Sequence, residues 1–167
     1  APPAASGSIN LNAAGDLAIS DFETTESLTG EPNFTTYIGA DVGRNATGTG
    51  SNITLRSENM TLDRGAQIGT NVFGNGTGGN INITVRDTAL ITDIGPLGMA
   101  SLLSSVDPLG TGDTGRISLN AGQLTVEEGA LIRTANFTQG VAGAIALNAD
   151  QINLRDTNNP PSTAQID

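Results

Sequence analysis

The stretch GAQIGTNVFGNGTGGNINITV, residues 65–85, recurs in altered form as GALIRTANFTQGVAGAIALNA, residues 129–149. Its last part, Ile-Asn-Ile-Thr-Val at 81–85, alternates β-branched and polar residues, which predicts a strand with one buried face. Residues 74–79 are rich in glycine, and we expect a turn there because glycine reaches positive φ without steric cost. The return of the whole pattern, rather than any one segment, decides the fold.

The repeat has a basic period of 28 residues, seen from Ile53 to Ile81 and again from Ile117 to Ile145. Each copy holds three groups of alternating aliphatic residues, separated by turns of Gly, Asn, Asp or Ser. We call the copies units 1 to 5, and they span about residues 7–50, 51–78, 79–114, 115–142 and 143–167. Repetition at this period predicts a solenoid, in which each unit buries its aliphatic residues against its neighbours.

The spacing also predicts which aliphatic residues lie above one another. The column of first strands is expected to contain Ile9, Ile53, Ile81, Ile117 and Ile145. In the second strand of unit 3, either Leu90 or Ile91 takes the inward position. In the third strands, Leu103 is expected to continue the column of Ile38, Ile68, Ile132 and Ile166. The prediction is an all-β chain, a parallel β-helix of about five three-strand units with neighbouring strands about 4.8 Å apart.

The units differ in length between their second and third strands. Units 2 and 4 are compact there, with Ile68 only six positions after Leu62 in unit 2. Units 1, 3 and 5 instead carry the insertions DFETTESLTGEPNFTT, DIGPLGMASLLSSVDPLG and DTNNPPSTA. We therefore expect a row of loops at one corner of the solenoid, in alternate units.

Composition limits the function classes that fit the chain. The formal net charge is −10, which argues against nucleic acid and anionic membranes as partners, because both attract a basic surface. The chain has neither Cys nor His, which excludes metal sites built on thiolate or imidazole and the Cys-His and Ser-His-Asp types of catalysis. No segment approaches the roughly 18 consecutive apolar residues of a membrane span.

Two acidic groups are candidates for a site. Asp113, in the loop GDTG at 112–115, and the nearby Asp93 and Asp107 are candidate Ca²⁺ ligands, because Ca²⁺ binds carboxylate and carbonyl oxygens. The alternative is that all three are ordinary turn residues. Glu127 and Glu128 are adjacent carboxylates, but neighbouring residues on a strand point to opposite faces, which favours solvated turn residues over a catalytic pair. No catalytic residue and no other cofactor is predicted.

The segment SNITLRSENMTLDRGAQIGTNVFGNGTGGNINI, residues 51–83, resembles the repeats of filamentous-hemagglutinin-like exoproteins of two-partner secretion systems, especially the cyanobacterial ones. GRISLNAGQLTVEEGALIRTANFTQG, residues 115–140, is a looser copy. The resemblance is good over about residues 50–155 and weak before them. It implies a right-handed parallel β-helix in a protein secreted to the outer surface of a bacterium, where the repeats form a stalk without catalytic residues.

We therefore expect a non-catalytic stalk or scaffold of an adhesin-like or filament protein, whose loop row contacts a cell-surface glycan or receptor. The alternative is a β-helix domain that binds or cleaves carbohydrate. Cleavage would need acidic residues in register on neighbouring strands, whereas the outward positions are mostly Thr, Asn, Ser and Ala. No capping segment is evident beside unit 1 or unit 5. Both ends are expected to meet more β-helix, either in a longer chain or in a second copy stacked head to tail.

Overall fold

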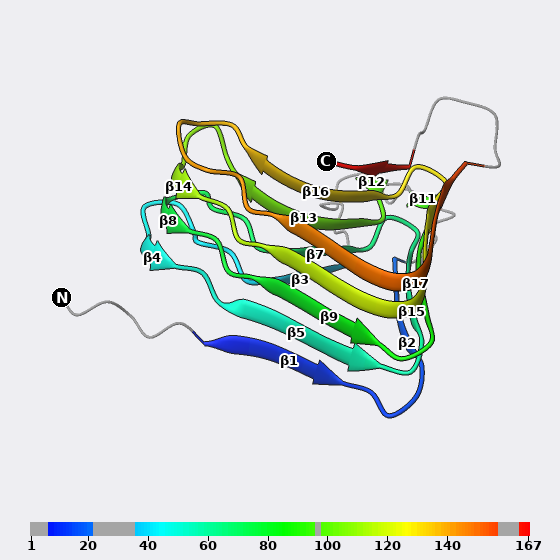
Figure 1. The fold of residues 1–167 in the computed structure, drawn as a ribbon. Coiled ribbons are helices and arrows are strands. Elements are labelled where there is room, and N and C mark those ends of the chain that lie inside the picture. Colours follow the sequence, from blue (N-terminus) through cyan, green and yellow to red (C-terminus); the bar gives the residue numbers. More distant parts are fainter. Residues whose placement is uncertain (1–6, 22–35, 96–97, 157–163) are drawn as a thin grey trace, which may run out of the picture.

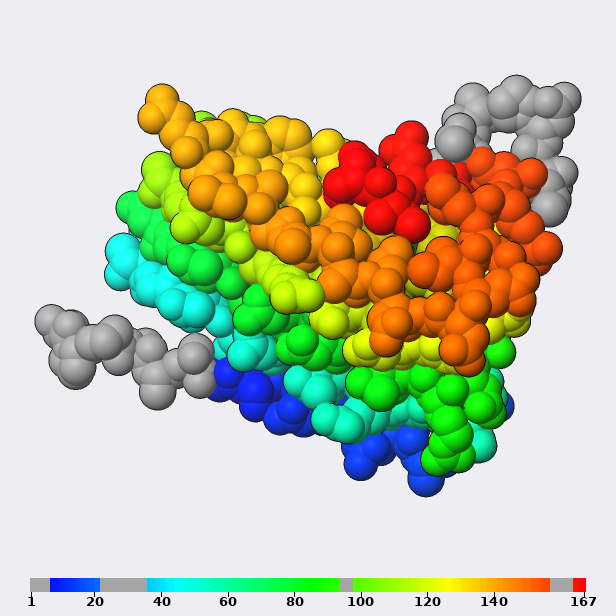
Figure 2. Space-filling view, in the orientation of Figure 1, coloured from blue at the N-terminus to red at the C-terminus, as the bar shows by residue number. Residues whose placement is uncertain are grey.

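The computed structural model describes residues 7–21, 36–95, 98–156 and 164–167. Over these residues the chain is all-β and contains no helix. Every strand pairing is parallel except that of one short hairpin. Figure 1 shows the strands of successive units side by side, and Figure 2 shows the units as successive bands from blue to red. The prediction of an all-β chain with parallel sheets is confirmed.

The largest sheet contains the first and second strands of each unit. Its strands are β1 (Ser8–Asn12), β2 (Leu17–Ser20), β5 (Asn52–Ser57), β6 (Met60–Asp63), β9 (Ile81–Val85), β10 (Thr88–Ile91), β15 (Ile117–Glu127) and β17 (Ile145–Arg155). In units 4 and 5 the two predicted strands are one, because β15 and β17 run through the corner without a break. The first half of β15 pairs with β9 and its second half with β10, so the two layers form one curled, 8-stranded sheet.

The third strands form a second sheet, and short fourth strands form a third. The second sheet contains β3 (Tyr37–Gly39), β7 (Gln67–Gly69), β13 (Ser101–Val106), β16 (Leu131–Asn136) and β18 (Gln165–Ile166). The third contains β4 (Thr47–Thr49), β8 (Asn75–Thr77) and β14 (Thr111–Asp113). The prediction of three strands per unit is therefore wrong for units 1 to 3, and residues 74–79 contain a strand rather than only a turn.

Close backbone packing explains why these fourth strands are rich in glycine. A Cβ added to Gly76 would lie 1.9 Å from the carbonyl oxygen of Gly48 in the preceding unit. A Cβ on Gly112 would lie 1.7 Å from the carbonyl oxygen of Gly76. Glycine is needed here because the backbone of one unit rests directly on the backbone of the next.

The core columns follow the predicted register in the first strands. Ile9, Ile53, Ile81, Ile117 and Ile145 are aligned by the pairings of β1, β5, β9, β15 and β17. The inward side chains of units 2 to 4 are almost completely buried, and Ile117 is 0% exposed. They form the main hydrophobic cluster, which fills the space between the sheets.

In unit 3 the structure settles one register that the sequence left open and corrects another. Ala89 and Ile91 are buried and pair with β6, so Ile91 rather than Leu90 takes the inward position. Leu102 pairs with Ile68 and Ile132, which makes the assignment of Leu103 to this column wrong. Two adjacent leucines give no alternation, and the sequence pattern therefore could not fix which of them points inward.

The insertions lie where the chain passes from the second strand to the third. In unit 3 this segment contains a short antiparallel hairpin, β11 (Ile94–Gly95) and β12 (Gly98–Met99). The predicted insertion was too long there, because residues 101–106 form β13. In units 1 and 5 most inserted residues, 22–35 and 157–163, lie outside the described part. Their flanks do meet: the Thr36 hydroxyl donates to the Ser20 carbonyl at 3.1 Å.

Candidate functional site

The structure does not bring the three candidate calcium ligands together. Asp93 lies before β13 and Asp107 after it, and a six-residue strand is about 20 Å long. The Asp107 carboxylate accepts a hydrogen bond from the Leu109 amide at 2.9 Å, and the Asp113 carboxylate accepts one from the Val141 amide at 2.7 Å. In the part of the chain that is described, no group of three or more acidic side chains is placed to hold a metal ion.

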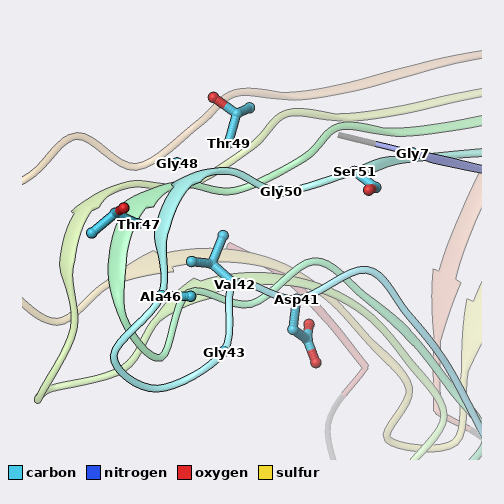
Figure 3. A pocket seen from close by; sticks show the side chains of 10 residues that line it. All are labelled: Gly7, Asp41, Val42, Gly43, Ala46, Thr47, Gly48, Thr49, Gly50 and Ser51. Carbon is cyan, nitrogen blue, oxygen red and sulfur yellow. The ribbon is translucent and has the colours of Figure 1, made fainter. Parts of the chain in front are cut away.

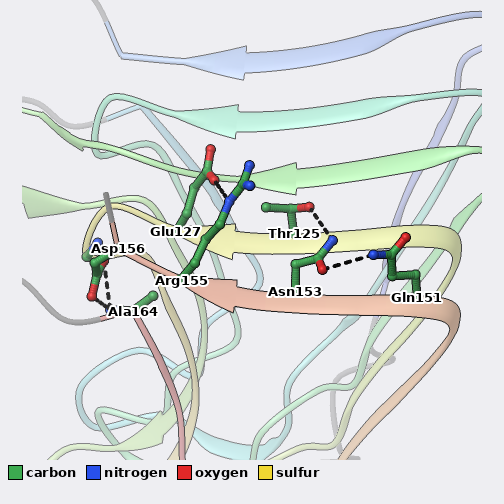
Figure 4. A network of polar contacts seen from close by, with 8 residues as sticks. Thr125, Glu127, Gln151, Asn153, Arg155, Asp156 and Ala164 are labelled. Atoms are coloured by element: carbon green, nitrogen blue, oxygen red, sulfur yellow. Dashed lines mark hydrogen bonds and ion pairs between the residues drawn. The ribbon is translucent and has the colours of Figure 1, made fainter. Parts of the chain in front are cut away.

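Glu127 and Glu128 do not form a carboxylate pair. Glu127 ends β15, and its Oε2 accepts a hydrogen bond from Nε of Arg155 in the next unit at 2.7 Å (Figure 4). Glu128 begins the turn that follows and has a φ of 53°. The first carboxylate is therefore held against the neighbouring unit, whereas the second belongs to the corner of its own unit.

An aspartate occupies this corner wherever a unit carries an insertion, and the sequence reasoning named this position only at Asp93, as a candidate calcium ligand. Asp21, Asp93 and Asp156 follow the second strands of units 1, 3 and 5, where the compact units have Arg64 and Glu128. The signal was visible, because each of the three inserted segments begins with Asp.

The contacts of Asp156 show what this aspartate does. Its Oδ1 accepts a hydrogen bond from the amide of Gly129 in unit 4 at 3.1 Å. Its Oδ2 accepts one from the amide of Ala164, where the chain returns from its insertion, at 3.0 Å (Figure 4). The carboxylate therefore fixes both the base of the inserted segment and the contact with the preceding unit.

The end of the molecule formed by unit 1 contains a shallow pocket of about 220 Å³ (Figure 3). It lies beside β4, the terminal strand of the third sheet. Its lining is mostly backbone and small side chains, with Gly43, Gly48 and Gly50 among the residues and Asp41 and Val42 at one side. On its other side β4 pairs with the glycine-rich strand β8 of unit 2, where Gly76 lies opposite Gly48.

The opposite end, formed by unit 5, exposes residues that are buried in the other units. Ile152 is 45% exposed and Leu154 is 51% exposed, whereas their partners Leu124 and Val126 on β15 are both 0% exposed. Polar side chains on the outer side of the same strand bond to one another, as Gln151 does to Asn153 at 3.2 Å (Figure 4). The apolar columns of the core are therefore open at this end.

A different kind of surface lies on the outer side of the second sheet, around Tyr37. A Cβ built on Gly39 would lie 2.1 Å from Cε1 of the tyrosine ring, and one built on Gly69 would lie 2.9 Å from Cε2. These atoms are on opposite edges of the ring, so one face of the ring rests on the sheet. The hydroxyl donates to Asp41 Oδ1 at 2.7 Å and accepts from Asn71 Nδ2 at 2.9 Å. Sequence reasoning did not single out this residue.

Burial of the Tyr37 ring raises the pKa of its hydroxyl above the ordinary value of 10.0, and the bond to Asp41 and its negative charge act in the same direction. The protonated phenol therefore stabilises the fold below about pH 10, and this stabilisation is lost as the pH rises above that value.

The chain has no Lys, Cys or His, so no other side chain titrates between pH 9 and about 12. We expect the urea midpoint to fall from pH 9 to pH 11 in the native chain but not in Tyr37→Phe. Equal losses in both would contradict this assignment.

The comparisons with known proteins give no relative. No protein-family model matches the chain, and no curated protein or solved structure is significantly similar to it. Among the described residues there is no helix long and apolar enough to cross a lipid bilayer.

Proposed function

We propose that the units are the turns of a right-handed parallel β-helix, and that this helix is a non-catalytic stalk or scaffold of a secreted bacterial surface protein. The parallel, in-register pairing of successive units supports the β-helix. Crossover connections between parallel strands are almost always right-handed, which supports the hand. The resemblance of residues 51–83 to exoprotein repeats supports the location and the stalk role.

The observation that carries the proposal is the state of the two ends. Ile152 and Leu154 continue columns that are fully buried in unit 4, yet about half of the surface of each residue is exposed. At the other end Ile9, Leu11 and Leu17 are only partly buried. A parallel sheet that ends on apolar side chains and unpaired backbone groups favours the addition of further strands. We infer that more β-helix, from adjoining sequence or from a second copy, covers both ends.

The shape of the pocket beside β4 also supports the inference that more β-helix covers the unit 1 end. A strand that paired with β4 on its open side would meet the backbone of Gly48, as β8 does on the other side. Such a strand could rest directly on Gly48, because nothing lies within 4 Å of a Cβ built at that position, whereas a Cβ at Gly76 or Gly112 would overlap a carbonyl oxygen of the unit before it. The glycine-rich fourth strand of this repeat is a segment of that kind, and it is the occupant that we propose.

Charged side chains at the outer surface form ion pairs between neighbouring units, as expected of a scaffold. Arg86 pairs with Glu58 at 2.9 Å, and Arg155 pairs with Glu127 at 2.7 Å, in each case between neighbouring units. Exposed ion pairs contribute little energy each, but they favour one register over its neighbours. These charged side chains bond to one another and do not converge on a common site.

Sedimentation velocity over a range of concentrations tests the stacking. We expect the native chain to form linear species that grow with concentration and appear as rods in electron micrographs. Leu154→Glu places a charge on the open end of unit 5 and should shift the chain to monomers. Leu109→Glu is the matched control, because Leu109 is 78% exposed on a loop between β13 and β14. A native chain that stays monomeric at every concentration, or equal effects of both variants, would contradict stacking of copies through these ends.

A further inference from the structure

The ring of Tyr37, rather than a special backbone conformation, explains the two glycines beneath it. Gly39 and Gly69 lie in strands, and neither is among the residues with positive φ. Glycine weakens a strand, so its presence at both positions needs a reason. In units 3 and 4 the same column continues as Leu103 and Arg133. Glycine thus occurs in the two strands on which the ring rests, and side chains return where the ring does not reach.

A row of polar side chains runs beside the ring across three units. Asp41, Asn71 and Ser105 each directly precede a valine of the bridged set Val42, Val72 and Val106, so they occupy one column. The Ser105 hydroxyl donates to Asn71 Oδ1 at 2.7 Å, and the backbone N–H of Asn71 donates to Asp41 Oδ1 at 2.6 Å. With the two bonds of the tyrosine hydroxyl, these contacts hold the row and the ring in a fixed arrangement.

The exposed face of the ring and the polar row together present two kinds of surface side by side. Tyr37 keeps 40% of its surface exposed although one face rests on the sheet, so the other face is turned to solvent. The face of an aromatic ring is negative and attracts the weakly positive C–H groups of an apolar ligand surface. Carboxylate, amide and hydroxyl groups spaced about 4.8 Å apart, as on neighbouring strands, can bond a series of ligand hydroxyls.

We propose that this surface binds a neutral polysaccharide, with one sugar ring stacked on Tyr37 and its hydroxyls bonded to Asp41, Asn71 and Ser105. A pyranose has an apolar C–H face and a rim of hydroxyls, which matches an aromatic face bordered by a polar row. The surface lies on the outer side of a β-sheet, so it suits an internal residue of a long glycan rather than a free monosaccharide. The surface differs from the stacking surface because it is the outer face of the second sheet, although Tyr37 lies on the terminal strand β3 and Asp41 also lines the pocket at the unit 1 end.

The chain offers a direct readout of such binding. Tyr37 is the only tyrosine and the chain has no tryptophan, so intrinsic fluorescence on excitation near the tyrosine band reports this ring above all. We would titrate the native chain with cellohexaose, xylohexaose, mannohexaose and maltohexaose, and with poly-L-lysine as a cationic probe. Affinity electrophoresis in gels that contain the corresponding polymers would give a second measurement that does not depend on fluorescence.

Four variants locate the site. Tyr37→Leu should abolish binding in the gels, and Gly69→Ala should weaken it about tenfold, because a Cβ at position 69 would lie 2.6 Å from the tyrosine hydroxyl oxygen and lift the ring. Tyr37→Phe keeps the ring and should bind more weakly than the native chain but more tightly than Tyr37→Leu. Phe137→Leu is the control, since Phe137 is 55% exposed and follows β16 in unit 4, outside the residues that the proposal names. Circular dichroism would establish that each variant is folded.

The titrations and gels have distinct results for and against the proposal. Binding of at least one neutral hexasaccharide, lost in Tyr37→Leu and kept in Phe137→Leu, is the expected result. Three results would overturn the proposal: no response to any of the four sugars, binding of poly-L-lysine alone, or equal losses in Tyr37→Leu and Phe137→Leu. A chain that stacks into rods but binds no sugar would leave the stalk proposal standing and remove this one.

Discussion

Replacement of Ile117 by aspartate is expected to lower the free energy of unfolding by at least about 4 kcal/mol. Ile117 is 0% exposed and lies in register between Ile81 and Ile145. The aspartate would remove the aliphatic contacts with both neighbours and place a carboxylate where no water reaches it. Because a domain of this size is stabilised by roughly 5–15 kcal/mol in total, a loss of this size would leave much of the chain unfolded.

The measurement is urea denaturation followed by circular dichroism. Asn120→Asp is the matched control, because Asn120 lies on the same strand, faces outward and is exposed. The same charge there should change the stability by no more than about 0.5 kcal/mol. If Ile117→Asp were as stable as the control, the register of the whole first layer would be wrong.

Gly115→Ala is expected to destabilise the chain by about 3 kcal/mol, although it adds a single methyl group. A Cβ at position 115 would lie 1.8 Å from the carbonyl oxygen of Gly79 and 2.5 Å from its carbon. Both are backbone atoms of the neighbouring unit, so no side chain can move aside to make room. The two units would have to separate locally, and the parallel bonds beside the contact would be strained.

Gly15→Ala is the comparison for this second variant. Nothing lies within 4 Å of a Cβ at position 15, and the residue does not have a positive φ. Alanine there should leave the stability unchanged or raise it by up to about 1 kcal/mol, since it restricts the unfolded chain. Equal stability of Gly115→Ala and Gly15→Ala would mean that the units are not in direct backbone contact at this corner.

The sequence predicted the first layer because its alternation is regular. Each first strand places isoleucine or leucine at every second position, so one register alone buries them all. The pattern failed where alternation is absent: Leu102 and Leu103 are equally apolar, and the inward Ala89 is too small to stand out. The fourth strands were missed because Gly-Asn-Thr runs signal turns far more often than strands, and here close packing between units overrides the local preference.

The candidate sites were harder to predict than the fold. Asp93, Asp107 and Asp113 are close in sequence, but a strand of six residues separates the first two in space. The role of the corner aspartates depends on the return of the chain after each insertion, which no local pattern shows. Tyr37 gains its position from glycines in two different units, and the second of them, Gly69, is 32 residues away in the sequence. Contacts of this kind follow from the register between units and could be recognised only once that register was known.

The central claim is that units continue in register from one copy to the next, and an engineered disulfide tests it most directly. The column Asn12, Arg56, Thr84, Asn120 and Asn148 runs through the five units. Its ends are about 19 Å apart within one chain, which is too far for a disulfide. If β1 of one copy pairs with β17 of another, positions 12 and 148 of the two copies come within about 5 Å of each other.

The variant Asn12→Cys, Asn148→Cys introduces the only two thiols, because the chain has no cysteine. On mild oxidation we predict a ladder of covalent multimers that disappears with reductant, and mass spectrometry should find bonds that join position 12 of one copy to position 148 of another. The pair Asn12→Cys, Asn153→Cys is out of register and should give far fewer bonds between its two positions. A protein that remains monomeric after oxidation, or that joins 12 to 153 as readily as 12 to 148, would contradict end-to-end stacking.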